Sequence, residues 1–306
     1  MKCIVCGKNS WNNPFSAQDR MFELPGKFFI YRCRHCGLLR VAPKLTSSQL
    51  AAYYPPKKYY SYQHSYSPGV FWRLRTFLVK RNTIFSKMLN VVIHVPAIPE
   101  GRSPGKIMDI GCGSGDTLSL LRDIGWETYG LDIDKQAVVI AHRNNLSNVK
   151  HGSYTSLRTY PDGFFDVIRL YHVIEHLDDP QLLLRLAHKK LKKGGELIIG
   201  TPNADSLLAK TAGTYWYNLD SPRHLFIFSP GTLGRLLTDN TFSVESLDFS
   251  SIGGIVGTVQ YFFTEKLGLK RKFIYNAWAI ILMYPLERIL DWCGAGDICL
   301  IMARKK

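Results

Sequence analysis

The sequence has no uninterrupted apolar stretch of the roughly 18 residues that a membrane-spanning helix requires. Its start, Met-Lys-Cys, also lacks the apolar segment of a secretory signal. Acidic residues are scarce near the start: residues 1–105 contain 3 Asp or Glu against 16 Lys or Arg, a net +13 of the chain's +15. We therefore expect a cytoplasmic protein with a basic amino-terminal face, which suits phosphate, anionic lipid or an acidic substrate equally well.

Cysteine is uncommon too, but four of the seven cysteines lie within the first 36 residues in a repeated pattern. Two Cys-x-x-Cys-Gly motifs occupy residues 3–7 and 33–37. Each cysteine pair can chelate one tetrahedral ion, and each glycine lets the backbone amides turn toward the sulfurs. In a reducing cytoplasm this pattern predicts a zinc ribbon over residues 1–45 rather than disulfides. The predicted zinc ligands are Cys3, Cys6, Cys33 and Cys36.

Residues 46–104 are predicted to form a basic helical linker. The stretch "LAAYYPPKKYYSYQHSY" (50–66) interleaves tyrosines with Pro-Pro and Lys-Lys. It suits either stacking against nucleic acid or a sugar ring, or a stiff linker whose tyrosines pack on the next domain. Residues 70–93 have the apolar period of a helix with a basic second face. Such a helix fits docking on the catalytic domain and also contact with a membrane surface.

The stretch "KIMDIGCGSGDTLSLLRDIGWETYGLDID" (106–134) reads as a strand, a glycine turn, a helix and a second strand. It lacks the last glycine of a dinucleotide-binding Gly-x-Gly-x-x-Gly motif, because that position is Asp116, whose negative charge opposes a pyrophosphate. Instead, Asp109 precedes the first glycine by two residues and suits an ammonium group. Asp132 ends the second strand, where a carboxylate can accept hydrogen bonds from both ribose hydroxyls. A ribose and an ammonium without a phosphate describe S-adenosylmethionine (SAM).

Strands and helices go on alternating through a third short strand in "NVKHG", which predicts a doubly wound α/β sheet. In such a sheet the ligand lies at the carboxyl ends of the strands. The catalytic region is predicted to span residues 105–306.

With these motifs the chain resembles the class I SAM-dependent methyltransferases, and more closely a bacterial branch with an amino-terminal zinc ribbon. The resemblance is carried by the ribbon, "MDIGCGSGD", "FFDVIRLYHVIEHLDDP" (164–180), "LKKGGELIIGTPN" (191–203) and "SPRHLFIFSPGTLGRLL" (221–237). It implies a Rossmann-like, mostly parallel seven-stranded sheet. Similar chains often act on small molecules or sugars.

The resemblance also implies a set of SAM-binding residues: Asp109, Gly111, Cys112, Gly113, Gly115, Asp132, Ile133, Tyr171 and His172. Many relatives carry an acid after the third strand that holds the adenine amino group. This chain has "HGSY" there, so Ser153 or Tyr154 is expected to take that contact.

Methyl transfer is an in-line displacement from a sulfonium, so the protein aligns the nucleophile, removes its proton and excludes water. The groups responsible should follow the fourth and fifth strands. His176 and His224 are the predicted catalytic residues, because histidine accepts protons near neutral pH. The alternatives are structural: His176 holding Asp178 or Asp179 at a helix start, and Arg223 binding an anionic substrate beside a structural His224.

Residues 253–293 are expected to form a helical insertion before the last strand. Within it, "KRKFIYNAWAIILMYPLERIL" places a basic triplet ahead of fourteen mostly apolar positions. That run is too short to span a bilayer. It suits an interfacial or substrate-covering helix, or a helix packed on the domain.

We therefore predict a SAM-dependent methyltransferase that modifies a small hydroxylated, sugar, or glycan- or lipid-linked acceptor. The alternative is an RNA methyltransferase that holds RNA with its basic zinc ribbon. Nucleic acid is the less favoured partner, because the fourth strand ends in "YHVIEH" and not in the Asn-Pro-Pro-aromatic signature of exocyclic-amine methylation. The basic front leaves open a peripheral contact with the inner face of the membrane.

Overall fold

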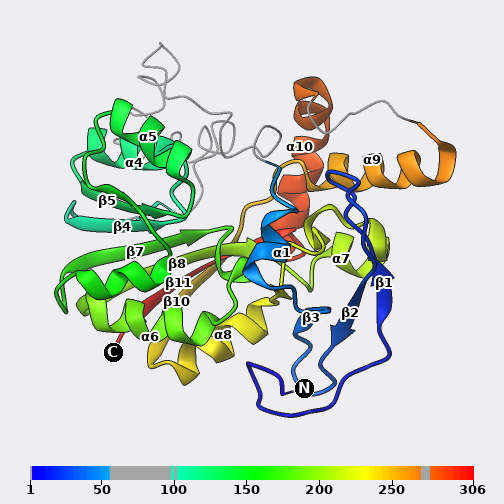
Figure 1. Ribbon diagram of the computed structural model, residues 1–306, viewed down its shortest axis with the longest axis horizontal. Helices are drawn as coiled ribbons and strands as arrows, with labels where there is room; N and C mark the ends of the chain where they lie inside the picture. Colours follow the sequence, from blue (N-terminus) through cyan, green and yellow to red (C-terminus); the bar gives the residue numbers. More distant parts are fainter. Residues whose placement is uncertain (1, 56–97, 100–101, 270–275) are drawn as a thin grey trace.

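The computed structural model describes residues 2–55, 98–99, 102–269 and 276–306 (Figure 1). The predicted linker helix at 70–93 and most of the tyrosine-rich segment at 50–66 lie outside the described residues.

A seven-stranded sheet forms the centre of the catalytic region, in the order β10-β11-β8-β7-β4-β5-β6. Its five parallel strands are β4 (Lys106–Ile110), β5 (Glu127–Asp132), β6 (Val149–His151), β7 (Phe165–Tyr171) and β8 (Leu191–Pro202). The antiparallel edge is made by β11 (Ile298–Lys305), which pairs with β8, and by β10 (Phe242–Phe249), which pairs with β11. The predicted doubly wound, mostly parallel seven-stranded sheet is confirmed.

Helices cover both faces of this sheet, as the two-sided burial of parallel strands requires. On one face α4 (Asp116–Asp123) and α5 (Lys135–Arg143) pack over Ile107 and Val167. On the other face α6 (Pro180–Lys190) and α8 (Pro230–Asp239) pack over side chains of β7 and β8 (Figure 1). Side-chain caps fix where α5, α6 and α8 begin, whereas α4 begins after Gly115 without one. For example, Asp179 accepts a hydrogen bond from the Leu182 amide ahead of α6.

The amino-terminal residues form a second, smaller sheet that includes a strand of the catalytic region. Its strands are β1 (Phe15–Ala17), β2 (Phe28–Arg32), β3 (Leu39–Ala42) and β9 (Phe226–Ile227). β3 pairs with β9 in the register Leu39 to Ile227. Phe28 and Ile30 of the ribbon share a core with Trp216 and Leu219. The predicted ribbon therefore shares a sheet and a hydrophobic core with the catalytic region. The boundary between the ribbon and the linker, placed at residue 45, stays a prediction.

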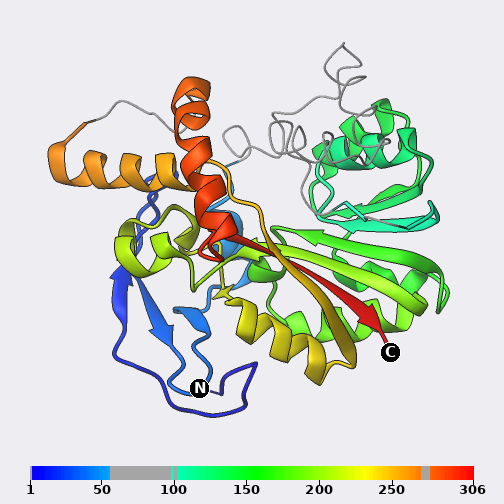
Figure 2. The same ribbon diagram turned by 180° about the vertical axis from the view of Figure 1, so that it is seen from behind.

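Short elements connect these layers: α1 (Ser47–Ala51), η2 (Tyr154–Thr159), η3 (Ile174–His176), α7 (Leu207–Ala212), η4 (Gly213–Tyr215) and η5 (Tyr217–Leu219). Between β10 and β11 the expected helical insertion consists of α9 (Gly254–Leu267) and α10 (Ala277–Trp292). One end of α10 projects past its neighbouring elements (Figures 1 and 2). Across the described ranges, no helix combines the length and the apolar character needed to cross a membrane.

Candidate functional site

The glycine loop between β4 and α4 is a tight turn with three left-handed residues. Gly111, Gly113 and Gly115 have φ angles of 73°, 54° and 83°. A Cβ on Gly111 would lie 2.5 Å from Val173, and one on Gly115 would lie 2.2 Å from Leu146. At Gly113, in contrast, a Cβ would meet nothing within 4 Å. The outer two glycines are needed for packing, whereas Gly113 borders open space of the kind a ligand occupies.

Asp132 lies next to this open space, at the carboxyl end of β5. Its Oδ2 accepts a hydrogen bond from the Gly113 amide at 2.7 Å, and its Oδ1 accepts one from the Asp134 amide at 2.8 Å. Burial raises the pKa of Asp132, and the two backbone amides partly offset that rise. The neighbouring Ile133 is 75% exposed and offers an apolar surface. This arrangement suits a ribose at the carboxylate and a base against Ile133.

Asp109 is placed differently from the expectation that it faces an ammonium group. Its carboxyl is 1% exposed, and both of its oxygens accept hydrogen bonds from Arg169 Nη1 at 2.8 Å. Burial raises the pKa of Asp109, and the charge of Arg169 opposes that rise. An ammonium would have to share this carboxylate with Arg169. Cys112, inside the loop, remains a thiol because burial raises its pKa well above the usual value.

Tyr171 and His172 stand at the end of β7, beside the glycine loop, as the resemblance implies. His172 has a φ of 54°, a left-handed conformation that is rare outside glycine and recurs at functional sites. Its amide donates to Gly200 O at 2.9 Å, and its ring lies 4.6 Å from that of Tyr171. A Cβ on Gly200 would lie 2.4 Å from Tyr171, so Gly200 gives that ring its room.

The two residues proposed to replace the adenine-binding acid are both engaged elsewhere. Tyr154 is buried, and its hydroxyl donates to Asp178 Oδ1 at 3.2 Å. The Ser153 hydroxyl caps η2 by accepting from the Thr155 amide at 3.2 Å. The phenol oxygen keeps lone pairs that can accept from an amino group, but the burial of Tyr154 argues against it as the adenine contact. Ser153 remains the better placed of the two, at the surface end of β6.

A cluster of two histidines around a buried glutamate lies after β7. Glu175, in η3, is fully buried; its Oε2 accepts from Thr201 Oγ1 at 2.9 Å and its Oε1 lies 3.2 Å from His172 Nδ1. Burial raises the pKa of Glu175, but the hydrogen bond with His172 and the nearby histidines outweigh it and bring the pKa to about 2. The ring centroids of His176 and His224 are 4.6 Å apart. The structure thus brings together the two histidines that were predicted to be catalytic.

Both histidines turn the same ring nitrogen to a backbone carbonyl. His224 Nδ1 lies 2.8 Å from Asn218 O, and His176 Nδ1 lies 3.0 Å from Arg223 O. A carbonyl oxygen only accepts, so each Nδ1 carries the hydrogen and each neutral ring keeps its lone pair on Nε2. Burial, followed by the charge of His176, lowers the pKa of His224 to about 4. His224 is therefore neutral at pH 7.

His176 makes neither the contact with Asp178 nor the one with Asp179 that its structural alternative requires, whereas His224 is buried against a backbone carbonyl, as its structural alternative expects. Asp179 caps α6 and Asp178 receives the Tyr154 hydroxyl, while His176 faces Arg223 O and the Tyr54 hydroxyl at 3.1 Å. Arg223 does not face a substrate, because its side chain is fully buried. It forms ion pairs with Asp19 at 2.7 Å and with Asp220 at 2.6 Å. Arg223 thus ties the loop that carries His224 to the ribbon.

One residue of the site, Arg169, was missed in the sequence. It had a signal, because a charged residue inside the apolar strand "FDVIRLY" requires a buried partner, and Asp109 stands opposite it in the sheet register. Glu175 was a candidate through its place in "YHVIEH", but the sequence did not indicate that it lies near both histidines. The contact of Tyr54 with His176 agrees with the expectation that tyrosines of segment 50–66 pack on the next domain, although the sequence did not indicate which residue Tyr54 meets.

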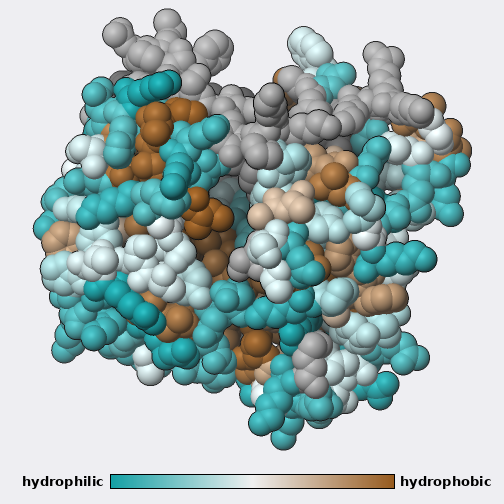
Figure 3. Space-filling view, viewed as in Figure 1, coloured by the Kyte–Doolittle hydropathy of each residue, from teal (hydrophilic) through white to brown (hydrophobic). Residues whose placement is uncertain are grey.

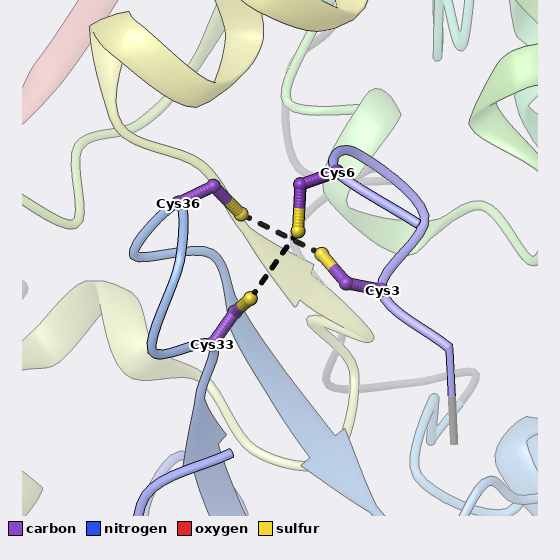
Figure 4. Close-up of side chains that lie close together, drawn as sticks. All are labelled: Cys3, Cys6, Cys33 and Cys36. Carbon is purple, nitrogen blue, oxygen red and sulfur yellow. Dashed lines mark hydrogen bonds between the residues drawn. The ribbon is translucent and has the colours of Figure 1, made fainter. Parts of the chain in front are cut away.

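The four predicted zinc ligands converge from two loops of the ribbon (Figure 4). The sulfurs of Cys3 and Cys36 are 3.5 Å apart, those of Cys6 and Cys33 are 3.6 Å apart, and all four lie within 4.8 Å of one another. A tetrahedral zinc with Zn–S bonds of about 2.3 Å needs sulfurs roughly 3.8 Å apart. The cluster therefore fits zinc. The ligand atoms of Glu175, His176 and His224 also lie within 4.8 Å of one another, so this group could hold a cation as well.

Figure 3 shows a hollow near the middle of the face seen in Figure 1, with hydrophobic residues at its bottom. The carboxyl ends of the parallel strands point to this part of the molecule (Figure 1). The η3 loop touches the glycine loop there, through the close approach of Val173 to Gly111. The predicted cofactor loop and the histidine cluster are thus neighbours at one edge of the sheet.

Comparisons with known proteins agree with this geometry. A family model described as "Methyltransferase domain" matches residues 86–247. A ubiquinone biosynthesis O-methyltransferase of Idiomarina loihiensis is 26% identical over 166 residues, which cover 49% of this chain and 68% of that protein. A probable S-adenosylmethionine-dependent methyltransferase of Mycolicibacterium smegmatis is 32% identical over 98 residues, 32% of this chain and 38% of that protein. The chain thus spans well under half of the length of the second relative.

Among solved structures, a SAM-dependent methyltransferase from Archaeoglobus fulgidus aligns with a TM-score of 0.48 and 22% identity, over 78% of this chain and all of that one. The family match extends over more than half of the 306 residues. The chain therefore belongs to the methyltransferase-domain family and is a class I SAM-dependent methyltransferase.

Proposed function

We propose that this methyltransferase transfers the methyl group of SAM to a hydroxyl oxygen of a small-molecule acceptor, which is a hydroxylated, sugar, or glycan- or lipid-linked compound. The observation that carries the proposal is the pair of histidines beside the glycine loop, of which His176 is partly exposed and has its Nε2 lone pair left for a proton, while His224 Nε2 faces the carboxylates of Glu175 and Asp220. The name O-methyltransferase of the Idiomarina relative supports oxygen as the acceptor atom. The comparisons lend no support to the RNA alternative.

His176 is the better placed of the two to accept the proton. His176 is partly exposed. His224 is buried, and because its pKa is lowered to about 4, its ring takes up a second proton only at low pH. As the acceptor oxygen attacks the methyl carbon, the carbon–sulfur bond breaks and its electron pair stays on sulfur. The hydroxyl proton moves to His176 Nε2. Glu175 stabilises the resulting imidazolium, since it is a buried carboxylate held near both rings.

For the cofactor we propose that Asp132 binds the ribose, that Ile133 contacts the adenine and that Gly113 leaves room for the methionine part. Tyr171 and His172 would border the same pocket from the end of β7. We also propose that the cysteine cluster holds one structural zinc. All four of its positions are taken by thiolates, so such a site closes without an open position for chemistry.

The test compares the purified enzyme with His176→Asn and His224→Asn, using methyl-labelled SAM and two acceptor pools: a small-molecule and lipid extract, and total cellular RNA. We expect label in the first pool. His176→Asn should lower kcat by about 10²- to 10⁴-fold, the usual contribution of a general base, and leave SAM affinity unchanged.

The matched control is His142→Asn, an exposed histidine on α5. It should keep full activity. Stoichiometric label in RNA alone, or an unchanged kcat in both cluster variants, would overturn the proposal.

A further inference from the structure

Helix α10 exposes its apolar side chains and buries its charged ones, the reverse of a water-facing helix. Trp278 and Trp292, near its two ends, are 79% and 85% exposed. The charged side chains of Glu287 and Asp291 are buried, and that of Arg288 is 14% exposed. The exposed residues recur at the three- and four-residue spacing of one helical face: Trp278, Ile281, Leu282, Leu286, Ile289 and Trp292.

Hydrogen bonds fix the rotation of α10 about its own axis. Glu287 accepts from the amides of Gly253 and Ile255 at 2.9 and 3.0 Å, and so caps the amino end of α9. Asp291 accepts from the Ser251 amide at 3.0 Å and from its hydroxyl at 2.6 Å, and pairs with Arg288. Turning the apolar face inward would strip these carboxylates of their donors. The apolar face is therefore held outward.

This face lies at the functional edge of the sheet. The α9–α10 insertion follows the end of β10 and leads into the start of β11. Because β11 is antiparallel to β8, its start lies at the carboxyl edge of the parallel strands, where the glycine loop and the histidine cluster lie (Figures 1 and 2). The stripe from Trp278 to Trp292 is about 21 Å long at the rise of an α-helix.

Charge near α10 favours one of the possible occupants of this face. Residues 1–105 carry +13 of the chain's +15, but a basic triplet, Lys270, Arg271 and Lys272, precedes the α10 cap residue Asn276 in the sequence. An anionic lipid surface attracts such a triplet, whereas a second copy would bring a like-charged triplet to the same helix. Tryptophans are enriched at the membrane–water interface, where their rings are half apolar and half polar. With its 16 residues, α10 is also too short to span.

We propose that α10 lies in the interface of an anionic membrane, with its apolar face in the acyl boundary, and that it turns the carboxyl edge of the sheet toward the lipid. An amphiphilic acceptor could then reach the site without leaving the membrane. The basic triplet that precedes the helix in the sequence adds attraction to anionic headgroups, which salt screens.

The test is co-sedimentation of the full chain with vesicles of phosphatidylcholine alone or mixed with phosphatidylglycerol. We expect binding to the mixed vesicles that weakens as salt is raised. Trp278→Glu combined with Leu282→Glu should lower the partition coefficient at least about tenfold, because two apolar anchors are replaced by charges that anionic lipid repels. Val139→Glu combined with Val244→Glu is the matched control: it places the same two charges at exposed apolar positions of α5 and β10 and should bind like the unaltered chain.

Circular dichroism and gel filtration show whether each variant keeps the fold. Equal binding of the double variant and the unaltered chain would overturn the proposal, as would no binding to either vesicle. A dimer in sedimentation equilibrium that the double variant dissociates would assign the face to a second copy instead. Vesicle binding is measured without SAM or acceptor, so its outcome is separate from that of the methyl-transfer assay.

Discussion

At the residue scale, Asp132 shows how backbone geometry aims a carboxylate. One amide from the glycine loop and one from the start of α5 hold its two oxygens in place. Each oxygen has a second lone pair to offer to a ribose hydroxyl.

Replacing Asp132 by alanine should therefore weaken SAM binding. Losing a charged acceptor of two hydrogen bonds costs about 2 kcal/mol, roughly a 30-fold rise in Kd, which isothermal calorimetry would measure. Asp239→Ala is the control, since it removes an exposed carboxylate that pairs with Arg235 at 3.7 Å on α8. An unchanged Kd in Asp132→Ala would rule out the ribose contact.

The lowered pKa of His224 predicts how the free energy of unfolding depends on pH. Burial lowers its pKa to about 4, against about 6.5 in an unfolded chain. As the pH falls, the unfolded chain binds this proton first. The contribution of His224 to stability is therefore complete above about pH 6.5 and is lost progressively toward pH 4.

Between pH 7 and pH 4, the unaltered protein should lose roughly 3 kcal/mol more unfolding free energy than His224→Asn. Denaturant titrations at each pH would measure this difference, in which the titrations of groups distant from His224 cancel. Parallel pH profiles for the two proteins would contradict the assigned protonation.

At the element scale, the amino-terminal ribbon supports the strand β9, which precedes helix α8. β3 of the ribbon pairs with β9, and the amide of Leu225, next to His224, donates to Glu175 O at 2.8 Å. A metal bound by the four cysteines would therefore stabilise the segment that carries His224, although no cysteine is part of the histidine cluster.

We predict one zinc per chain, measured by elemental analysis of protein purified without chelators. The double change Cys3→Ser and Cys6→Ser should abolish zinc binding, lower the Tm and reduce methyl transfer, because a closed structural zinc contributes folding free energy directly. Cys293→Ser, at an exposed cysteine, should change none of these. A metal-free protein whose residues 2–45 resist proteolysis as well as the zinc-bound form would contradict this prediction.

The place of His176 in the chain is also set at this scale. His176 lies in the 3-10 turn η3, separate from helix α6. Asp179 and Pro180 fix the start of α6 three residues later, through a side-chain cap and a proline at the first helical position. That separation leaves the His176 ring beside Tyr54 and Arg223.

At the scale of the whole molecule, a buried ion pair joins the ribbon to the catalytic loop. Asp19 of the ribbon and Arg223 are both fully buried and lie 2.7 Å apart. Asp19 also accepts hydrogen bonds from the amides of Met21, Phe22 and Leu24. The two parts should consequently unfold together.

Asp19→Ala should lower the free energy of unfolding by about 3 kcal/mol, the lower end of the cost of breaking a buried pair, because Asp220 still neutralises Arg223. Chemical denaturation followed by tryptophan fluorescence would give this value and show a single transition in the unaltered protein. Glu23→Ala removes an exposed acid from the same loop and should stay within about 0.5 kcal/mol. A similar small effect for Asp19→Ala, or two separate transitions in the unaltered protein, would show that the ribbon is independent.

The sequence alone determined the features that depend on local pattern. The alternation of strand and helix periods, the glycine spacing and the acid at the end of β5 predicted the sheet and the cofactor loop. The two cysteine motifs predicted a tetrahedral cluster, because each motif brings two sulfurs together within a few residues. The insertion before β11 was likewise visible as an apolar helical run.

Only the tertiary structure decided which distant side chains meet. Arg223 could not be assigned from its neighbours, since its partner Asp19 lies 204 residues away in the chain. Asp109 looked available to a ligand until the register of β4 and β7 placed Arg169 against it. The outward face of α10 depended on buried acids that cap another helix. In each case a buried charge must find a partner, and the fold, rather than the local sequence, determines which partner is within reach.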